Sequence, residues 1–448
     1  MAGDDIADLM PLIESRWDSV PLGNVTVFVN GDRGKNYPSQ SDYVSRGVPF
    51  ISAADLMDGR VDAGNCTFIT EAAFDRLGGG KTKEGDLLFC LRGSLGKVAR
   101  IRSIPRGAIA SSLVIIRATD QADRDYLYYI LSGPLGQRFA AELNNGSVQP
   151  NISARSLKES CIPLPPLAEQ KAIAAVLGAL DDKIELNRRM NATLEAMARA
   201  LFQSWFVDFD PVRAKLDGRP PAALDPATAA LFPEHLEEST LGHIPKGWEG
   251  AELGQIAHVI DCLHAKKPER CDAGQLYLQL NNIRDDGLID ITDSFFVGAE
   301  DYQKWISRME AVAGDCVITN VGRVGAVGQI PEGVKAALGR NITGIRCKAE
   351  FPFPTFLIEC LVSESMREEI RLKTDSGTIL DALNVKSIPK LRFVRPTREI
   401  GARFEELTRP VRRRMEQNIS ESRTLATLRD TLLPKLLSGE LSVTELQN

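Results

Sequence analysis

The chain has 448 residues, of which 43% are hydrophobic and 25% are charged, and its formal net charge is −6. This composition is typical of a globular protein with several domains, and it argues against binding to nucleic acid through bulk positive charge. No apolar run approaches the length of a membrane span, no secretion signal opens the chain, and the eight cysteines follow no framework spacing. We therefore expect a cytoplasmic protein with reduced thiols.

The first part of the chain, residues 17–117, consists of short runs of strand-forming residues separated by turn residues. Residues 85–101 (GDLLFCLRGSLGKVARI) place apolar runs on both sides of Gly93 and Gly96. This pattern predicts a strand, a tight glycine turn and a second strand. Residues 81–106, around this hairpin, hold seven basic and two acidic side chains, and such a local excess favours contact with phosphates.

Helical segments around residues 126–144, a polar loop and a short strand complete the first part. A mostly apolar stripe follows, whose members alternate by four and three positions, as in the contact face of a coiled-coil helix. Pro165 and Pro166 precede it, and prolines suit a helix start because the first N–H groups lack helical partners. The stripe consists of Ile173, Leu177, Leu180, Ile184, Asn187, Asn191, Leu194, Ala198, Leu201 and Trp205.

The next segment, residues 207–245, is rich in proline, alanine and aspartate. We interpret it as an ordered crossover with short helical turns rather than as a mobile linker. Its prolines are Pro211, Pro220, Pro221, Pro226 and Pro233.

Beyond this crossover the chain repeats itself. Trp17 recurs as Trp248 and Gly146 recurs as Gly377, both at an offset of 231 residues (248 − 17 and 377 − 146). The predicted hairpin recurs as residues 314–330 (GDCVITNVGRVGAVGQI). A period of this length is that of a whole domain and not of a solenoid unit. The chain therefore contains two copies of one module, and two related but non-identical sites.

The second copy continues like the first, with helical segments around residues 355–373, a polar loop and a second heptad stripe. Two such stripes in one chain predict an intramolecular coiled coil. Asn187 and Asn418 occupy the same position of the two stripes, and a buried Asn that finds a partner fixes the register. Leu407 or Leu428 could replace polar members of the second stripe. Its members are Phe404, Thr408, Val411, Met415, Asn418, Ser422, Leu425, Arg429, Leu432 and Leu436.

No catalytic motif is complete in this sequence. A phosphate-binding loop needs a glycine five residues before its Gly-Lys pair, but Asp75 stands five residues before Gly80. The Asn- or Asp-Pro-Pro-aromatic motif that would hold a flipped base for methyl transfer is missing as well. All four histidines lie outside the first copy, which excludes a Ser-His-Asp site in both copies. We therefore predict no catalytic residue in this chain.

One group of residues has the chemistry of a metal site. His258, Cys262, His264 and Cys271 could in principle hold zinc. Their spacing is wider than is usual for structural zinc, and the first copy has no counterpart. Ordinary core and surface roles are therefore favoured, and we predict no metal ligand.

Polar residues near the glycine turns are candidates for contact with DNA. A solvated hairpin tip would explain any single one of them. The glycines persist in both copies whereas the polar residues differ, as expected for two modules with one frame that read different sequences. Arg and Asn can pair with purine edges, while Lys and Ser mostly contact phosphates. The candidates are Arg92, Ser94, Lys97, Ser111, Ser112, Ser147, Gln149 and Asn151 in the first copy, and Asn320, Arg323, Arg340, Asn341 and Thr378 in the second.

Several longer motifs resemble one protein family. Residues 162–170 (IPLPPLAEQ) open the first long helix, and residues 204–212 (SWFVDFDPV) close it. Residues 244–248 (IPKGW) open the second copy, residues 432–441 (LLPKLLSGEL) end the second helix, and residues 85–89 (GDLLF) begin the hairpin. Over nearly its whole length the chain is similar to the specificity subunit of type I restriction–modification systems.

This resemblance implies that each module is a target recognition domain for one half of a two-part DNA site. It also implies that the long helices pair antiparallel as a ruler between the half-sites. The implied partners are double-stranded DNA, two modification subunits that use S-adenosylmethionine, and two restriction subunits that use ATP and magnesium. Catalysis and cofactors would reside in those partners. Residues 397–400 (TREI) depart from the motif that opens the first long helix, residues 166–169 (PLAE).

We therefore predict an α+β fold. Two similar target recognition domains, each a small mixed sheet with short helices, would be separated by two long helices that form an intramolecular antiparallel coiled coil. The predicted boundaries are 1–162 for the first module, 163–206 for the central long helix, 207–245 for the crossover, 246–394 for the second module, 395–440 for the C-terminal long helix and 441–448 for a tail.

Two other functions stay open at this point. One is a protein-interaction scaffold with degenerate recognition modules, and the other is a self-sufficient DNA methyltransferase or nuclease. Salt-dependent binding to duplex DNA would argue against the scaffold. Turnover by the purified chain would establish the enzyme.

Overall fold

The computed structural model describes residues 16–62, 64, 66–102, 106–145, 150–292, 294–375 and 381–443. The chain divides into two compact units, of which unit 1 combines Met1–Ile184 with Thr424–Asn448 and unit 2 is Glu185–Arg423. Both units combine helices with small sheets, so the predicted α+β class is confirmed. No helix among the described residues is both long enough and apolar enough to cross a membrane.

Unit 1 contains a six-stranded sheet, a five-stranded sheet and a two-stranded pair. The six-stranded sheet has the order β2 (Thr26–Asn30), β12 (Leu113–Ala118), β9 (Leu87–Cys90), β10 (Val98–Arg100), β6 (Arg60–Val61) and β5 (Leu56–Met57). The five-stranded sheet has the order β3 (Tyr43–Val44), β7 (Thr67–Ile69), β4 (Val48–Ile51), β11 (Gly107–Ile109) and β8 (Lys81–Thr82). The pair consists of β1 (Ser19–Pro21) and β13 (Cys161–Pro163). β9 and β10 pair antiparallel across the glycine turn, which confirms the predicted hairpin. β10 pairs parallel with β6, and β11 with β4, so both larger sheets are mixed.

Unit 2 repeats this topology. One four-stranded sheet has the order β17 (Ala257–Ile260), β24 (Ile342–Cys347), β21 (Cys316–Thr319) and β22 (Val327–Gln329). The other has the order β19 (Phe296–Val297), β18 (Gln275–Leu278), β23 (Ala336–Leu338) and β20 (Glu310–Ala311). Strands also form the pairs β16 (Glu249–Glu252) with β27 (Arg392–Arg395), β14 (Leu236–Ser239) with β15 (Gly242–Pro245), and β25 (Thr374–Asp375) with β26 (Ala382–Leu383). The order β17-β24-β21-β22 matches β2-β12-β9-β10, and β19-β18-β23-β20 matches β7-β4-β11-β8. The repeat seen in the sequence is therefore a repeat of fold.

Short helices accompany the sheets. They are α1 (Glu71–Arg76), α2 (Arg124–Ser132), α3 (Pro134–Glu142) and α4 (Ala154–Glu159) in unit 1, and α6 (Asp210–Leu216), α7 (Pro226–Leu231), α8 (Leu253–Ile256), α9 (Ala299–Trp305), α10 (Pro354–Val362) and α11 (Glu364–Leu372) in unit 2. α2 packs against β9 and β10, and α10 packs against β21 and β22. α6 and α7 are the helical turns expected in the crossover.

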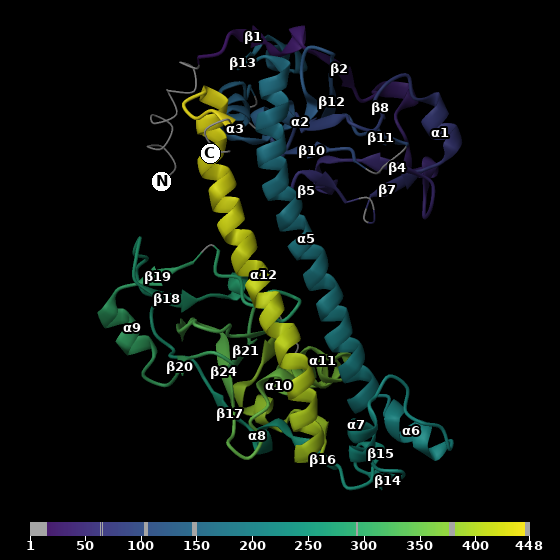
Figure 1. Cartoon of the computed structure of the whole chain (residues 1–448), viewed down its shortest axis with the longest axis vertical. Helices are drawn as coiled ribbons and strands as arrows, with labels where there is room; N and C mark the ends of the chain where they lie inside the picture. Colours follow the sequence, from purple (N-terminus) through teal and green to yellow (C-terminus); the bar gives the residue numbers. More distant parts are fainter. Residues whose placement is uncertain are drawn as a thin grey trace. The chain divides into compact units, whose positions relative to one another are not determined.

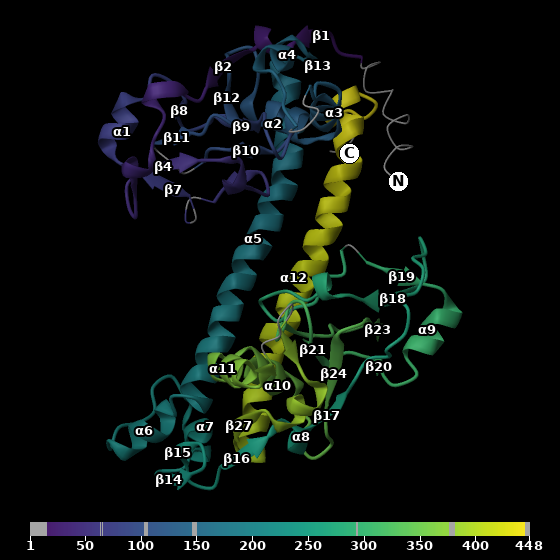
Figure 2. The ribbon, with the colours of Figure 1, turned by 180° about the vertical axis from the view of Figure 1, so that it is seen from behind.

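The two long helices are α5 (Leu167–Phe206) and α12 (Arg398–Ser438), and each contributes a part to both units. Within each unit they run side by side (Figures 1 and 2). In unit 2 the Asn191 side chain donates to the Met415 carbonyl at 3.0 Å, and Phe202 lies 5.9 Å from Phe404 between ring centres. Residue numbers rise along α5 as they fall along α12, so the helices are antiparallel. The predicted long helix pair is confirmed.

The predicted stripes face inward in both helices. Ten members are buried: Ile173, Leu177, Asn187, Ala198, Trp205, Phe404, Thr408, Met415, Asn418 and Leu436. The other ten are half-buried: Leu180, Ile184, Asn191, Leu194, Leu201, Val411, Ser422, Leu425, Arg429 and Leu432. Leu407 and Leu428, which we expected as replacements, are 38% and 45% exposed. That expectation is wrong, because the polar members Thr408 and Arg429 keep their places in the contact.

Asn187 and Asn418 lie buried where α5 and α12 meet within unit 2. The Asn187 amide donates to the Glu421 carboxylate at 2.9 Å, to the Ser422 hydroxyl at 3.2 Å and to the Asn418 carbonyl at 3.4 Å. The Asn418 amide donates to the Asn191 side chain at 2.7 Å. Because these bonds form only when the two helices are aligned in this way, they favour one register over its neighbours.

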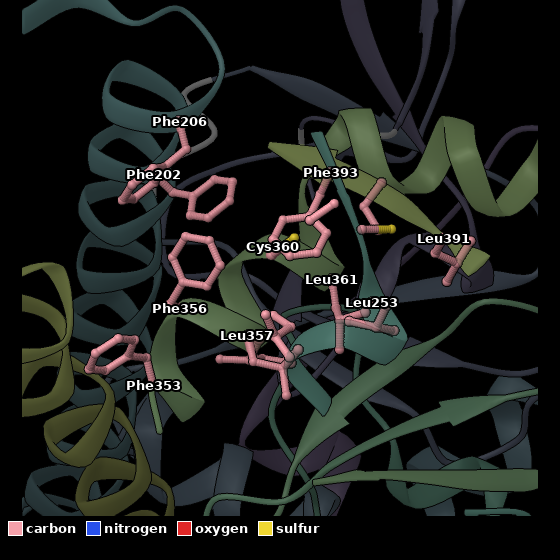
Figure 3. Packing of buried hydrophobic residues seen from close by; sticks show 14 of the residues in the cluster. Phe202, Phe206, Leu253, Phe353, Phe356, Leu357, Cys360, Leu361, Leu391 and Phe393 are labelled. Atoms are coloured by element: carbon pink, nitrogen blue, oxygen red, sulfur yellow. The ribbon is translucent and has the colours of Figure 1, made fainter. Parts of the chain in front are cut away.

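Aromatic side chains at the end of α5 anchor the second module. Phe206 lies 5.0 Å from Phe356 and 5.0 Å from Phe404 between ring centres. Figure 3 shows Phe202 and Phe206 of α5 facing Phe356 of α10. Trp205 is 1% exposed and packs on Phe232 after α7 at 5.0 Å. The SWF segment thus belongs to the core that joins α5, α10 and α12 in unit 2.

A buried polar joint fastens the first module to α5. Asp181 accepts a hydrogen bond from the Tyr129 hydroxyl at 2.7 Å and lies 3.4 Å from the Arg100 guanidinium. Arg100 is 8% exposed, and its guanidinium lies 3.9 Å from the centre of the Tyr128 ring. Arg429 of α12 donates to the other Asp181 oxygen at 2.8 Å. The joint therefore ties β10, α2 and both long helices together within unit 1.

The second module has a joint at the equivalent positions with the charges reversed. Asp181 and Arg412 are the fifteenth residues of α5 and α12. Tyr129 and Glu359 are the sixth residues of α2 and α10. The Arg412 guanidinium lies 3.5 Å from the Glu359 carboxylate, with both side chains almost fully buried, and it also donates to the Gly287 carbonyl. The long helix carries an anion at this position in unit 1 and a cation in unit 2.

We predict that Arg412→Leu destabilises unit 2 by about 3–5 kcal/mol, because it leaves the Glu359 carboxylate buried without its partner. The double variant Glu359→Leu, Arg412→Leu is expected to recover most of this loss. Burial raises the pKa of Glu359 although Arg412 opposes the shift, so protonation at acid pH should relieve the single variant. Urea denaturation of the full chain between pH 8 and pH 5 measures both effects. A double variant as unstable as the single one would contradict the first, and a loss in the single variant that does not shrink as the pH falls would contradict the second.

Candidate nucleic-acid interface

In the first module three polar segments meet at the glycine turn between β9 and β10. The Leu91 N–H donates to the Ser112 carbonyl at 2.8 Å, and the Ile152 N–H donates to the Leu91 carbonyl at 2.8 Å. Arg92, the first residue of the turn, donates from Nε to the Asn151 side chain at 2.9 Å. These bonds bring together the hairpin turn, the turn before β12 and the end of the polar loop after α3.

The second module brings the same three segments together. The Asn320 N–H donates to the Asn341 carbonyl at 2.8 Å, and the Leu383 N–H donates to the Asn320 carbonyl at 2.9 Å. Asn320 directly follows β21, as Leu91 directly follows β9. The two modules therefore share one frame of backbone hydrogen bonds around the turn, on which different side chains are mounted.

The second glycine of each turn is required by its surroundings. Gly96 has a φ of +75°, and a Cβ atom there would lie 2.8 Å from the Ala140 Cβ of α3. Gly325 has a φ of +77°, and its Cβ would lie 3.0 Å from Ile370 of α11. Any other residue would be strained in the backbone and crowded by the helix. The glycine thus holds the turn against α3 in one module and α11 in the other.

An ion pair with a buried carboxylate supports the base of each hairpin. Asp86, directly before β9, receives two hydrogen bonds from the Arg117 guanidinium at 2.7 Å and 2.8 Å. Asp315, directly before β21, receives two from Arg346 at 2.8 Å and 2.5 Å. Both carboxylates are almost fully buried. Paired bonds of this kind fix geometry as well as charge, so the turns stand on a rigid base.

The candidate residues differ in how far they reach solvent. Ser94, Lys97 and Arg340 are exposed, while Arg92, Ser111, Ser112, Asn151, Arg323 and Asn341 are half-buried. Ser147, Gln149 and Thr378 lie outside the described residues. The three segments meet in both modules. In each module, therefore, all the described candidates but Asn320 lie at or near the surface around the glycine turn of that module.

Asn320 is a correction to the sequence-based interpretation. It is 5% exposed, and its amide donates to the Leu383 carbonyl at 3.1 Å while accepting from the Thr343 hydroxyl at 2.7 Å. A buried amide whose nitrogen and oxygen both bond inside the protein would have to break these bonds to reach a base edge. We therefore assign Asn320 to the frame of the turn and leave it out of the proposed contacts.

The excess of positive charge in residues 81–106 is smaller in the folded chain than in the sequence, because acids from other elements pair with several of these cations. Arg100 is buried in the joint with Asp181, Arg102 pairs with Asp182 at 3.1 Å, and Arg106 pairs with Glu71 and with Asp75 at 3.2 Å. Glu71 and Asp75 lie on α1, shortly before the hairpin, whereas Asp181 and Asp182 lie on α5, about 80 residues after it. Lys97 is the cation of this segment that is both exposed and part of the turn.

The residues that come together in the fold differ from the four that the sequence suggests as zinc ligands. Asp261, Cys262 and His264 have potential ligand atoms within 4.8 Å of one another, whereas His258 and Cys271 do not belong to this group. The His264 ring lies 2.8 Å from the Asp261 carboxylate, and Arg308 lies 3.4 Å from the same carboxylate. Burial raises the pKa of the Cys262 thiol. A protonated thiol beside a guanidinium does not favour a cation.

Sequence reasoning missed two arginines beside the second turn. Arg367 and Arg371 lie one helical turn apart on α11 and line a cleft together with Arg323. Their spacing of four residues on a short helix with a strongly polar face is a signal in the sequence. It was overlooked because nothing local places α11 next to the hairpin.

The chain matches known proteins over most of its length. Residues 14–196 match the family model of the type I restriction modification DNA specificity domain. The specificity subunit of the type I restriction enzyme MjaIX from Methanocaldococcus jannaschii is 26% identical over 90% of this chain and 89% of that protein. The specificity subunit of the type I restriction enzyme HindI from Haemophilus influenzae is 27% identical over 68% of this chain and 74% of that protein.

A solved structure supports the fold. The crystal structure of the S subunit of a type I restriction–modification system from M. genitalium aligns with a TM-score of 0.54 and 17% sequence identity, over 94% of this chain and 96% of that chain. At this identity the likeness concerns the fold alone.

We predict that Asn320→Ala lowers the free energy of unfolding of unit 2 by about 1–3 kcal/mol, because the Thr343 hydroxyl and the Leu383 carbonyl lose a buried partner. Arg340→Ala, in the exposed turn nearby, is the matched control and is expected to change stability by less than about 0.5 kcal/mol. Urea denaturation measures both. A stable Asn320→Ala variant that accepts a new base at one DNA position would reverse our assignment.

Proposed function

Because the chain belongs to the specificity subunits of type I restriction enzymes, we propose that it reads a two-part DNA site with one module for each half. The proposal rests on one observation: both modules build the same hydrogen-bonded frame around the glycine turn but mount different side chains on it. A common frame presents both turns to a duplex in the same way. Different side chains then select different bases, because the major groove offers a distinct pattern for each base pair.

The exposed members of each turn are the proposed contacts. Ser94 and Lys97 extend from the first turn, and Lys97 suits a phosphate whereas Ser94 suits a phosphate or a base edge. In the second module, Arg323 lies in the turn and Arg340 is exposed in the adjoining turn.

We propose that α5 and α12 set the gap between the half-sites. Each helix is continuous and contributes to both compact units, and a helix of 40 residues, the length of α5, is about 60 Å long. The buried Asn187 and Asn418 support one register. Linking two moderate readers through a stiff spacer makes the second engagement intramolecular, which multiplies specificity.

The chemistry is proposed to reside in partner subunits. Two modification subunits with S-adenosylmethionine would dock on the long helices, and two restriction subunits with ATP and magnesium would complete the complex. Leu186 and Met197 support such a surface, because both are more than half exposed on α5 and their spacing of eleven residues puts them on one face. This chain would recognise the DNA site and contribute no catalytic group.

Mapping of methylated adenines tests the proposal. Cells that express this chain together with its modification partner are expected to methylate a motif of two short specific halves with a fixed gap. Exchange of the second module for that of another specificity subunit should change one half and leave the other unchanged. A contiguous motif, or a change in both halves, would overturn the reading of one half by each module.

The ruler is tested by changing the length of the helices. Insertion of four residues into both α5 and α12, at the level of Asn187 and Asn418, lengthens the pair by about 6 Å. Because DNA rises by about 3.4 Å per base pair, the gap is expected to grow by about two base pairs with both half-sites unchanged. The same four residues inserted after Gly218, in an exposed part of the crossover, are the control. An unchanged gap in the helix variant would contradict the ruler.

A further inference from the structure

A cleft of about 510 Å³ opens beside the glycine turn of the second module. It is lined by Arg323 from the turn, by Arg367 and Arg371 from α11, and by Asp285 from the segment after β18. A neighbouring hollow of about 750 Å³ shares Arg323 and Arg367. Arg284 also lines both hollows but pairs with Asp286 at 2.7 Å. Three further guanidinium groups thus converge on one concave surface at the edge of the proposed DNA interface.

These guanidinium groups are held by acids that water reaches easily. Arg323 pairs with Asp285, whose side chain is 93% exposed. Arg371 pairs with Glu368 at 2.6 Å, and Arg367 lies 3.9 Å from Glu364. Exposed ion pairs of this kind add little stability, since each charge is well solvated without its partner. An anion that offers several oxygens at once can therefore displace these carboxylates.

The three arginines of the cleft have no counterparts at the equivalent positions of the first module. α3 and α11 are equivalent helices of nine residues each, and at the positions of Arg367 and Arg371 the first module has Gln137 and Ala141. Gln137 donates to the Gly96 carbonyl at 3.1 Å and closes the turn onto α3. Ser94 stands where the second turn has Arg323. The first module holds no arginine at these three positions.

We propose that Arg323, Arg367 and Arg371 bind the phosphodiester backbone of the DNA strand that flanks the half-site of the second module. The inference rests on the proposed function and adds to it a site for phosphate oxygens. The guanidinium group suits this ligand because its N–H groups form paired bonds with phosphate oxygens. Arg323 is thereby assigned to phosphate contact and not to base reading.

Asp285 has a role of its own in this site. Its carboxylate accepts a hydrogen bond from the Arg323 guanidinium, which also donates to the Ile283 carbonyl. The carboxylate holds Arg323 in the cleft and must yield to a phosphate before the arginine can bind DNA. Asp285 therefore weakens binding to DNA that lacks the recognition sequence and contacts the chain through phosphates alone. Base contacts then determine which sites are bound.

The first test is the salt dependence of binding. The full chain in complex with its modification partner is titrated with a duplex that contains its site, between 50 and 300 mM salt. Each phosphate contact contributes about 0.9 to the slope of log K against log salt, so Arg367→Gln, Arg371→Gln is expected to reduce the slope by about two. The base specificity of both half-sites should stay unchanged. Arg219→Gln, which removes an exposed arginine paired with Asp217 in the crossover, is the control.

The second test isolates Asp285. Asp285→Asn is expected to tighten binding to a random duplex by about threefold to tenfold, and to have no effect in the Arg323→Gln background. The ratio of specific to random binding should fall accordingly. Circular dichroism and urea denaturation of every variant verify that the fold is intact.

Four outcomes would overturn the inference. An unchanged salt slope in the α11 double variant, with wild-type binding to a two-part site, would remove the cleft from the interface and leave the proposed function standing. Relaxed choice of one base in Arg323→Gln would make Arg323 a base reader. Saturable binding of inorganic phosphate in calorimetry, with DNA affinity unaltered by the variants, would assign the cleft to a free anion. Tighter binding by Asp285→Asn in the Arg323→Gln background would deny the displacement. Failure of the wild-type complex to recognise any two-part site would instead refute the proposed function.

Discussion

The structure depends on how each module is fastened to its long helix. In unit 1 the Asp181 carboxylate of α5 is met by Arg100 and by the Tyr129 hydroxyl, and in unit 2 the Arg412 guanidinium of α12 is met by Glu359. A buried charge without a partner destabilises a protein far more than a matched buried pair does. The charge on each helix therefore admits only a surface of opposite charge. The glycine turn projects from the strands that this joint holds, so the position of the turn on its helix follows from the joint.

The reversal of sign matters because the chain is a duplication. Two modules with one topology could dock on each other's helices, and such exchange is a typical failure of repeated domains. On α12 the first module would bring Arg100 against Arg412, whereas the second module has the neutral Gln329 at that position of its sheet. On α5 the second module would bury Glu359 against Asp181. Both wrong arrangements bury like charges, so the polar joint favours the correct pairing in a way that an apolar joint of the same shape could not.

The features that were predictable from the sequence are those with a local cause. The hairpins follow from apolar runs around Gly93 and Gly96, and the helix stripes follow from their period. What escaped prediction depends on partners distant in the chain. The sequence predicts base reading by Asn320, because the Leu383 carbonyl, 63 residues away, is invisible to a local pattern. Arg102 belongs to a basic patch in the sequence, but Asp182, 80 residues away, neutralises it. Polarity at a turn shows that a group needs a hydrogen-bond partner, and only the fold shows where that partner lies.

The two modules show how far a recognition frame can vary without losing its shape. Three parts recur: the second glycine of the turn, the ion pair of a buried Asp with an Arg at its base, and the backbone bonds between the three segments. The exposed side chains of the two turns differ. The first module has Lys97, and its Arg92 bonds to Asn151, whereas arginines and Asp285 line the cleft beside the second turn. Leu91 and Asn320 mark the limit of this freedom. They share a buried position, and the polar residue is accepted there because Thr343 and Leu383 satisfy both ends of its amide. Positions outside the frame meet no such condition, so the exposed side chains of a turn can change while the fold beneath them stays the same.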